Sequence, residues 1–364
     1  MRRALTGLAA ALAMLTVGCT SSPSHGPKAL PVAQATSATG TVLLRHLDNA
    51  GAAFVDGTLY VWQQSNPVAT AGRTELMRVN PVNGRVMATR QLGLVGVGSW
   101  SPGSMVAADG WLWIAGVSEG KADGLGGWLL RLQPKTLVVQ SRIHLSGLGT
   151  PPKAVLAGGW LWVCAGDRLY RISPRSNHIT AKISLGDAES SDVTSSATGN
   201  QLLVSEEDES NGIGAIELRN AASGALVDST NPAILGVNAP SLSQVVDGGV
   251  WLSQSTGMMG YIERLDVSTL SPTPISLPFP IGHSTNGISA EVFAGVLYVQ
   301  QRDGGPDLNY CGDLTTGQIR AALALPSDAT LLTASATYLY YILDPGTQKG
   351  QGLARSAINP LCLG

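Results

Sequence analysis

A short pattern of apolar and turn-forming positions recurs seven times along this 364-residue chain. A turn residue, usually Gly, precedes an aliphatic residue and then an aromatic or second aliphatic residue, as in Gly110-Trp111-Leu112-Trp113. The aliphatic residues of the seven copies are Leu59, Leu112, Leu161, Leu202, Val250, Leu297 and Leu339. Successive copies are therefore 41 to 53 residues apart, which is the range for repeats of four β-strands.

A second pattern follows each copy and predicts a β-hairpin. In the first repeat, alternating apolar residues lead through Asn83-Gly84 into another strand-forming run. Each repeat is therefore expected to hold four strands, and in the first repeat these are residues 52–55, 59–63, 76–80 and 85–92. One such sheet cannot bury both of its faces alone, so the repeats must stack against one another. Large residues at equivalent positions are predicted to form this packing, namely Trp62, Trp113, Trp162 and Trp251.

The segment before the first repeat is expected to supply a strand that the seventh repeat lacks. The seventh repeat ends at Gly364 without a fourth strand, whereas residues 41–46 precede the first repeat and belong to no sheet of their own. We therefore predict an all-β fold over residues 41–364. It is a seven-bladed β-propeller with four-stranded blades, and its ring is closed by the N-terminal strand.

These motifs resemble the virginiamycin-B-lyase-like, NHL and YVTN group of propellers. In that group a Gly-x-Leu-Trp-Val strand is followed by Leu-x-Arg-Ile-Asp-Pro-x-Thr-Gly, and Gly159 to Trp162 and Leu169 to Pro174 are similar to it. The resemblance covers about residues 41 to 364 and implies the fold, not the function, since such propellers include enzymes, sensors and binding platforms. Lyases of the group use histidine and glutamate with a magnesium ion, and that constellation has no residue-by-residue match here.

The first 40 residues carry signals of export and anchoring. Arg2 and Arg3 precede a short apolar stretch that ends at Gly18-Cys19, which resembles a bacterial lipobox with Thr16 in place of the preferred Leu. We expect a lipoprotein signal peptide at 1–18 and, at 19–40, a lipidated Cys19 with a flexible tether rich in Ser, Pro, Ala, Thr and Gly. The alternative is an ordinary cleaved secretory signal, and both Sec and twin-arginine export remain open. The expected location is the cell membrane, lipid-anchored on its extracytoplasmic face.

The charge of the chain limits the kinds of partner that it can bind. The net charge is −2 without a dominant basic run, which argues against nucleic acid as a partner. The chain is expected to be a monomer.

In an oxidising compartment Cys311 and Cys362, which lie in neighbouring repeats, either form a disulfide or remain as two thiols, and Cys164 is expected to be a buried thiol.

Polar residues from all seven repeats are expected to converge where the fourth strand of one blade connects to the first strand of the next. A concave mouth with converging polar groups is the usual ligand site of a protein. The candidate ligand-binding residues there are Asp48, Asn49, Trp100, Ser101, Asp192, His283, Asn286 and Asp328. The alternative is that they cap strands and hydrate the channel. An acid–base role for His283 would need a carboxylate from Asp48, Asp192 or Asp328.

No catalytic residue, metal ligand or cofactor is predicted. The sequence has no HExxH, CxxC, GxSxG or P-loop motif. The acidic run from Glu206 to Glu209 is expected in a loop, where a solvated surface is favoured over a Ca²⁺ site because regular ligand spacing is missing. The preferred hypothesis is a propeller that binds a protein or cell-envelope ligand through its loops. The alternatives are a hydrolase or lyase with its active site at the channel mouth, and an envelope assembly scaffold.

Overall fold

The computed structural model describes residues 40–47, 50–65, 73–92, 100–120, 124–145, 152–185, 188–196, 198–208, 214–230, 240–255, 260–275, 288–301, 308–323, 325–326, 329–343 and 351–363. The described residues all belong to one compact unit, which spans residues 32–364. The predicted signal peptide, Cys19 and the tether up to residue 39 lie outside the described residues.

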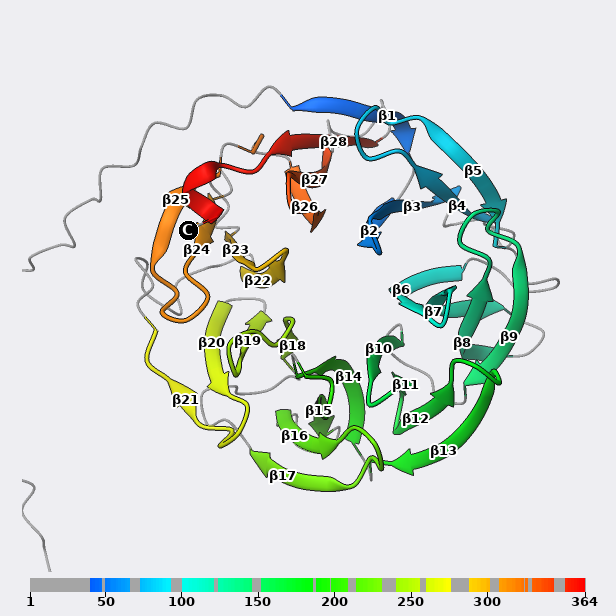
Figure 1. Ribbon diagram of the computed structural model, residues 1–364, viewed down its shortest axis with the longest axis vertical. Helices are drawn as coiled ribbons and strands as arrows, with labels where there is room; N and C mark the ends of the chain where they lie inside the picture. Colours follow the sequence, from blue (N-terminus) through cyan, green and yellow to red (C-terminus); the bar gives the residue numbers. More distant parts are fainter. Residues whose placement is uncertain are drawn as a thin grey trace, which may run out of the picture. The chain divides into compact units, whose positions relative to one another are not determined.

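The compact unit consists of seven four-stranded antiparallel sheets that are arranged as the blades of a propeller (Figure 1). Blade 1 contains β2 (Gly51–Val55), β3 (Thr58–Ser65), β4 (Arg73–Val79) and β5 (Val86–Gln91). Blade 2 contains β6 (Trp100–Ala108), β7 (Trp111–Gly120), β8 (Gly124–Leu132) and β9 (Val139–Leu145). Blade 3 contains β10 (Lys153–Ala157), β11 (Trp160–Ala165), β12 (Arg168–Ser173) and β13 (His178–Ser184).

Blades 4 to 7 follow in chain order. Blade 4 contains β14 (Ala188–Ser195), β15 (Gln201–Asp208), β16 (Gly214–Asn220) and β17 (Leu226–Thr230). Blade 5 contains β18 (Ser241–Leu242), β19 (Gly249–Ser255), β20 (Gly260–Asp266) and β21 (Pro272–Thr273), and blade 6 contains β22 (Ile288–Phe293), β23 (Val296–Gln301), β24 (Leu308–Gly312) and β25 (Ile319–Ala322). Blade 7 contains β26 (Ala329–Ala334), β27 (Tyr338–Leu343), β28 (Gln351–Ala357) and β1 (Thr41–Leu47), and the chain then forms the short helix η1 (Pro360–Leu363).

The repeated aliphatic–aromatic pair forms the packing between blades. Successive side chains of a strand point to opposite faces of the sheet. In blade 3, Leu161 therefore packs against Trp113 of blade 2, whereas the next residue, Trp162, packs against Leu202 of blade 4. Trp113, Trp162 and Trp251 are fully buried, so the prediction that the tryptophans pack between blades is confirmed for these three.

Polar side chains tie blades 3 and 5 to the outer hairpins of blades 4 and 6. The indole Nε1 of Trp162 donates a hydrogen bond to the Ala221 carbonyl oxygen of blade 4 (2.9 Å), and that of Trp251 donates to Leu314 of blade 6 (3.0 Å). Arg171, which lies opposite Trp162, acts in the same way. Arg171 Nη1 donates to the carbonyl oxygen of Ala222 (2.6 Å). These bonds satisfy buried donors while fixing the spacing of the blades.

The N-terminal strand closes the ring, as predicted. β1 pairs antiparallel with β28, with Thr41 opposite Arg355 and Leu47 opposite Gln351. Arg355 Nη1 in turn donates to the Pro81 carbonyl oxygen of blade 1 (3.2 Å). Blade 7 is thus built from both ends of the described chain and is tied to blade 1.

A disulfide takes the place of the arginine tie between blades 6 and 7. Arginine lies opposite the aromatic residue of β3, β7, β11, β19 and β27, but Cys311 lies opposite Tyr298 of β23. Cys311 is bonded to Cys362 of η1, with their Cα atoms 5.6 Å apart. Blade 7 has no hairpin between its third and fourth strands because its fourth strand is β1, so the covalent bond holds η1 where other blades present a turn. Cys164 is a buried thiol outside this disulfide.

Candidate functional site

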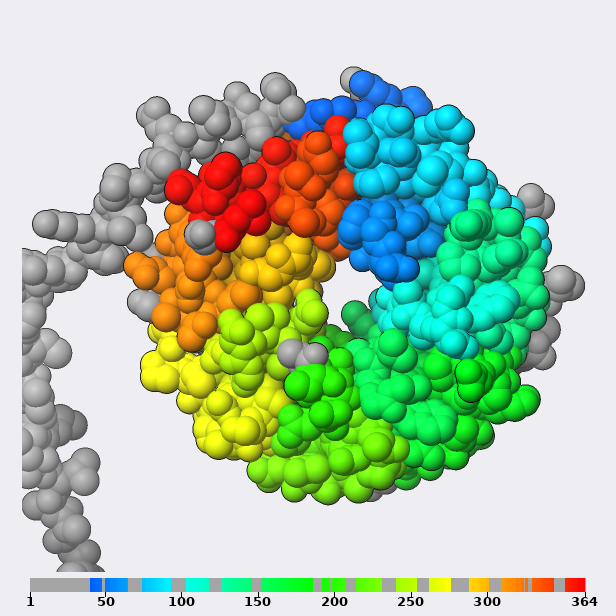
Figure 2. Space-filling model, in the orientation of Figure 1, coloured from blue at the N-terminus to red at the C-terminus, as the bar shows by residue number. Residues whose placement is uncertain are grey.

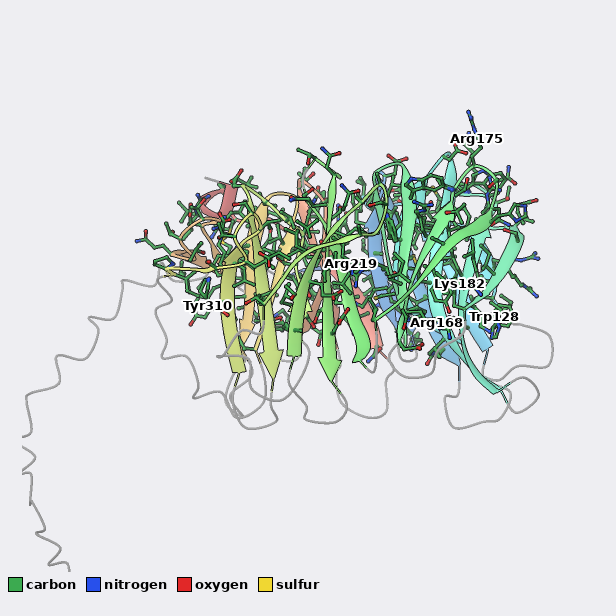
Figure 3. The ribbon with its side chains drawn as sticks, turned by 90° about the horizontal axis from the view of Figure 1, so that it is seen from below. Trp128, Arg168, Arg175, Lys182, Arg219 and Tyr310 are labelled. Carbon is green, nitrogen blue, oxygen red and sulfur yellow. A yellow bond between two sulfur atoms is a disulfide. The ribbon has the colours of Figure 1, made fainter. Side chains whose placement is uncertain are left out.

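The two faces of the ring differ in the connections that they carry. On one face, two-residue turns join the first two strands of blades 1, 2, 3 and 6; β2 ends at Val55 and β3 begins at Thr58. Both turn residues there have positive φ, 47° at Asp56 and 72° at Gly57, as a type I′ turn requires. The other face, which we call the loop face, has the longest connections, although only two residues separate β11 from β12 there. β21 ends at Thr273 and β22 begins at Ile288. Figure 3 shows Arg175, from an outer hairpin turn, and Arg168, at the loop-face end of β12, toward opposite faces.

Most of the predicted ligand-binding residues belong to loop-face connections outside the described part of the chain. These are Asp48, Asn49, His283, Asn286 and Asp328. Trp100 and Ser101 are described in their backbone only, and they are the first two residues of β6, opposite Ser118 and Val117 of β7. They therefore belong to the loop-face end of an innermost strand rather than to a connection.

Asp192 lies within a strand and not, as expected from the sequence, in a connection between blades. It is a buried residue of β14. Its Oδ1 accepts a hydrogen bond from the Val193 N–H (2.8 Å), and its Oδ2 accepts one from the Leu242 N–H of blade 5 (3.0 Å). Burial raises the pKa of Asp192, while the Lys153 charge and the two backbone donors lower it. Asp192 thus links the innermost strands of blades 4 and 5.

The same type of link occurs elsewhere in the inner ring. Ser104 Oγ of blade 2 accepts from the Ala154 N–H of blade 3 (2.7 Å), and Thr333 Oγ1 of blade 7 accepts from the Phe54 N–H of blade 1 (3.2 Å). The role of Asp192 in the described residues is therefore structural, since it repeats a contact that hydroxyl side chains make at other blades. Among these three links between described strands, Asp192 makes the one that uses a carboxyl group.

Two charged residues that the sequence analysis did not single out lie near Asp192 on innermost strands. Lys153 of β10 has the position in blade 3 that Asp192 has in blade 4, opposite Cys164 and Ser205 respectively. Glu291 lies on β22 in blade 6. Burial raises the pKa of Glu291 to about 7; the Asp192 charge raises it further and the Lys153 charge lowers it.

These three residues form what we call the inner charged group. Their strands come from blades 3, 4 and 6 and border the centre of the ring (Figure 1), which is open in the space-filling view (Figure 2). A carboxyl group whose pKa lies near neutral pH can both donate and accept a proton. The sequence analysis did not predict this group, because the sequence does not show which side chains of distant repeats lie on the inner wall of the ring.

The acidic run from Glu206 to Glu209 is not a loop, and this prediction was wrong for its first three residues. Glu206 to Asp208 continue β15, and Glu206 is buried on the face that also carries Leu202 and Val204 toward blade 3. Glu206 hydrogen-bonds Glu217, whose Oε2 pairs with Arg219 Nη2 (2.6 Å).

The environment of Glu206 keeps it protonated at neutral pH. Burial is the largest cause that raises its pKa, followed by the hydrogen bond to Glu217 and the Glu217 charge. Its Oε1 is buried without a hydrogen-bond partner. No cluster of three or more His, Cys, Asp or Glu residues able to hold a metal ion occurs among the described residues.

A cavity of about 550 Å³ lies on the face with tight turns, between blades 1 and 2. Its lining includes Asp56, Tyr60, Asp109, Trp111 and Leu156. The two aspartates are turn residues with positive φ, and Arg131 stacks on the ring of Trp111, 4.0 Å from its centre. The lining is thus explained by turn geometry and blade packing.

In the part of the chain that is described, no helix has the length and apolarity to cross a membrane.

Comparison with known proteins supports the fold. No protein family model matches the chain, and no curated protein matches it. Among solved structures, it is similar to the WD40 domain of Toxoplasma gondii coronin, with a TM-score of 0.58, 14% identity and coverage of 88% of this chain and 85% of that chain.

Two further solved structures show the same likeness. BamB from Moraxella catarrhalis aligns with a TM-score of 0.50 and 11% identity over 86% of this chain and 84% of that chain. The Dos1 propeller aligns with a TM-score of 0.53 and 13% identity over 82% of this chain and 75% of that chain. At these identities the likeness shows the fold alone, and the chain is a seven-bladed β-propeller.

Proposed function

We propose that this protein is a membrane-anchored extracytoplasmic propeller that binds a protein or cell-envelope ligand through its loop face. The observation that carries the proposal is the difference between the two faces. Tight turns join strands on one face, whereas on the loop face the chain runs from Thr230 to Ser241 and from Thr273 to Ile288 between strands. Long connections on a rigid scaffold are where binding residues concentrate in proteins.

The anchor is supported by the sequence before the propeller. An apolar stretch ends at Gly18-Cys19, and a Ser-, Pro- and Gly-containing segment separates Cys19 from Thr41, where β1 begins. Replacing Cys19 with Ser is expected to move the protein from the membrane to the soluble fraction. Cys164→Ser is the matched control, because it removes a thiol from blade 3 and should leave the protein on membranes. Unchanged fractionation of Cys19→Ser would refute the lipid anchor.

The loop-face assignment is tested by shortening one connection. We expect replacement of residues 276–287 by a short turn to abolish retention of envelope components by the immobilised protein. The control is an insertion at Arg175, in the outer hairpin turn of blade 3 on the opposite face, which should retain them. If the shortened variant retains the same components as the parent, the ligand does not bind through this part of the loop face.

A hydrolase or lyase is the second candidate, and the inner charged group favours it. Glu291 has a pKa near neutral pH and lies close to the charges of Lys153 and Asp192, as general acid–base chemistry requires. It also agrees with the resemblance to the virginiamycin-B-lyase-like group, although the lyase residues of that group have no match here. In an enzyme, Glu291→Gln would stop conversion of a bound ligand without releasing it. In a binding protein, both forms would return the ligand unchanged.

An envelope assembly scaffold is a narrower form of the binding hypothesis. A scaffold holds several proteins at once and is expected to co-purify with them from solubilised membranes in fixed proportions. A single ligand bound at the loop face would instead be displaced by an excess of the free ligand. Quantitative pull-down from membranes therefore separates the two.

A further inference from the structure

The outer wall of the ring has a distinctive surface where blades 7 and 1 meet. β1 and β5, the outermost strands of these blades, follow one another along the circumference (Figures 1 and 2). The outer hairpin turn of blade 1 packs between them; a Cβ added to Gly84 would stand only 2.6 Å from the Leu43 carbonyl oxygen. We call residues 41–47 and 80–91 together the seam surface.

The seam surface exposes large apolar side chains. Val42 is 36% exposed, Val82 58%, Val86 40% and Met87 38%. The outermost strands of the next two blades, β9 and β13, expose no large hydrophobic side chain. Among the described residues outside the seam, large apolar side chains are exposed at Leu226 and Val227 of β17, at Leu361 and Leu363 of η1, and at Leu156 of β10.

The seam surface is also basic. Arg45, Arg85 and Arg90 are exposed, and residues 41–47 and 80–91 contain no Asp or Glu although the chain as a whole has a net charge of −2. The apolar pair on β17 differs in this respect, because Asp228 follows it directly. Exposed apolar side chains surrounded by arginines are the combination that binds to the interface of an anionic bilayer.

We propose that the seam surface rests on the anionic phospholipid surface of the membrane, so that the propeller is held by its wall and its loop face is left accessible. This proposal rests on the proposed membrane anchor. The segment that follows Cys19 enters the fold at Gly40, directly before β1, so an anchored chain keeps the seam within the reach of the tether from the bilayer. Because a ring is convex and a bilayer is flat, contact is confined to this part of the wall.

A reporter on the wall tests the contact. Met87→Cys and, as a matched control, Leu226→Cys are made in the full chain and labelled with a fluorophore whose emission changes in lipid. Labelling is directed to the new residue because Cys164 is buried and Cys311 and Cys362 are bonded to each other; the chain without a new cysteine gives the background from Cys19. The label at residue 87 is expected to respond on phosphatidylglycerol vesicles and not on phosphatidylcholine vesicles. The label at residue 226 should respond on neither.

Charge variants separate the seam from the rest of the wall. Arg85→Gln with Arg90→Gln should lower the ratio of lipid-contacting to free reporter about 25-fold, at about five-fold for each arginine near an anionic surface. Lys182→Gln, an exposed site on β13 in blade 3 (Figure 3), should leave the ratio unchanged. An equal response at residues 87 and 226, an equal effect of Lys182→Gln, or a concentration-dependent response without vesicles would overturn the proposal. The last result would indicate a second copy of the chain on the seam.

Failure of the anchor and failure of the seam contact are distinguishable in this assay. Without an anchor, the protein would be absent from neutral vesicles. With an anchor but no seam contact, it would be present on both kinds of vesicle while the reporter at residue 87 stayed silent on both.

Discussion

Loss of the disulfide between blades 6 and 7 should destabilise the ring by about 4 kcal/mol. Cys311 and Cys362 are separated by 51 residues, and closing a loop of that length removes about 14 cal/mol/K of entropy from the unfolded chain. At 25 °C this corresponds to about 4 kcal/mol of the free energy of unfolding. The double variant Cys311→Ala/Cys362→Ala removes no arginine side chain at this position, because blade 6 has cysteine where five of the other blades have arginine.

Urea unfolding followed by tryptophan fluorescence measures this loss, since Trp113, Trp162 and Trp251 are fully buried in the folded ring. For an m-value of about 3 kcal/mol/M, the midpoint should fall by about 1.3 M urea. Cys164→Ala is the control: it removes a buried thiol from blade 3 without removing a cross-link, and its midpoint should move less. A double variant whose midpoint equals that of the control would refute the reasoning that this bond holds the closing blade.

Three further predictions concern stability. Burial and Glu217 raise the pKa of Glu206 above its ordinary value of 4.5, so the folded protein keeps a proton there that the unfolded chain loses. Its stabilising contribution is complete below about pH 4.5 and is lost as the pH rises, by up to about 1.4 kcal/mol per pH unit. Urea titrations from pH 5 to 8 should show a steeper loss of stability in the parent than in Glu206→Gln, which keeps only the part of the slope that comes from Glu291 and the other buried carboxyl groups; parallel slopes would contradict the prediction. Leu47→Ala removes a buried side chain of β1 and should lower the free energy of unfolding by about 2–4 kcal/mol. Deletion of residues 41–46 tests the same strand, and normal thermal unfolding of that variant would disprove closure of the ring by β1. Asp192→Ala leaves the buried N–H groups of Val193 and Leu242 without their acceptor and should cost at least about 2 kcal/mol in calorimetry; an unchanged melting temperature would show that the contact is dispensable.

The fold could be predicted from the sequence because its information is local and repeated. Each copy of the aliphatic–aromatic pair places one side chain toward each neighbouring blade, as Leu161 and Trp162 do, and seven copies at similar spacing leave little choice of architecture. The strands of blade 1, expected at 52–55, 59–63, 76–80 and 85–92, are observed within a few residues of those bounds. Cys311 and Cys362 were placed in neighbouring blades by the same repeat, and the structure joins them.

The candidate site was less predictable because it depends on contacts between distant segments. Glu206 was expected in a solvated loop, since a run of four acidic residues rarely continues a strand. It is buried beside Glu217, to which it hydrogen-bonds, and beside the charge of Arg219, and both residues lie on the next strand. These contacts depend on the register of β15 and β16. Asp192 was expected at the loop face, but its two backbone hydrogen bonds place it within the inner ring. The Lys153 charge lowers the pKa of Glu291 because the innermost strands of blades 3 and 6 border the same centre, which no local sequence pattern shows.

Cross-linking from the two faces of the propeller tests the proposed function most directly. A photo-cross-linking residue is introduced at Ser101, at the loop-face end of β6, or at Arg175, in the outer hairpin turn of blade 3 on the opposite face and away from the seam surface, and is activated in intact cells. The account predicts a discrete cross-linked protein or envelope component from residue 101 and none from residue 175. The same product from both residues, or a product from residue 175 alone, would contradict binding through the loop face.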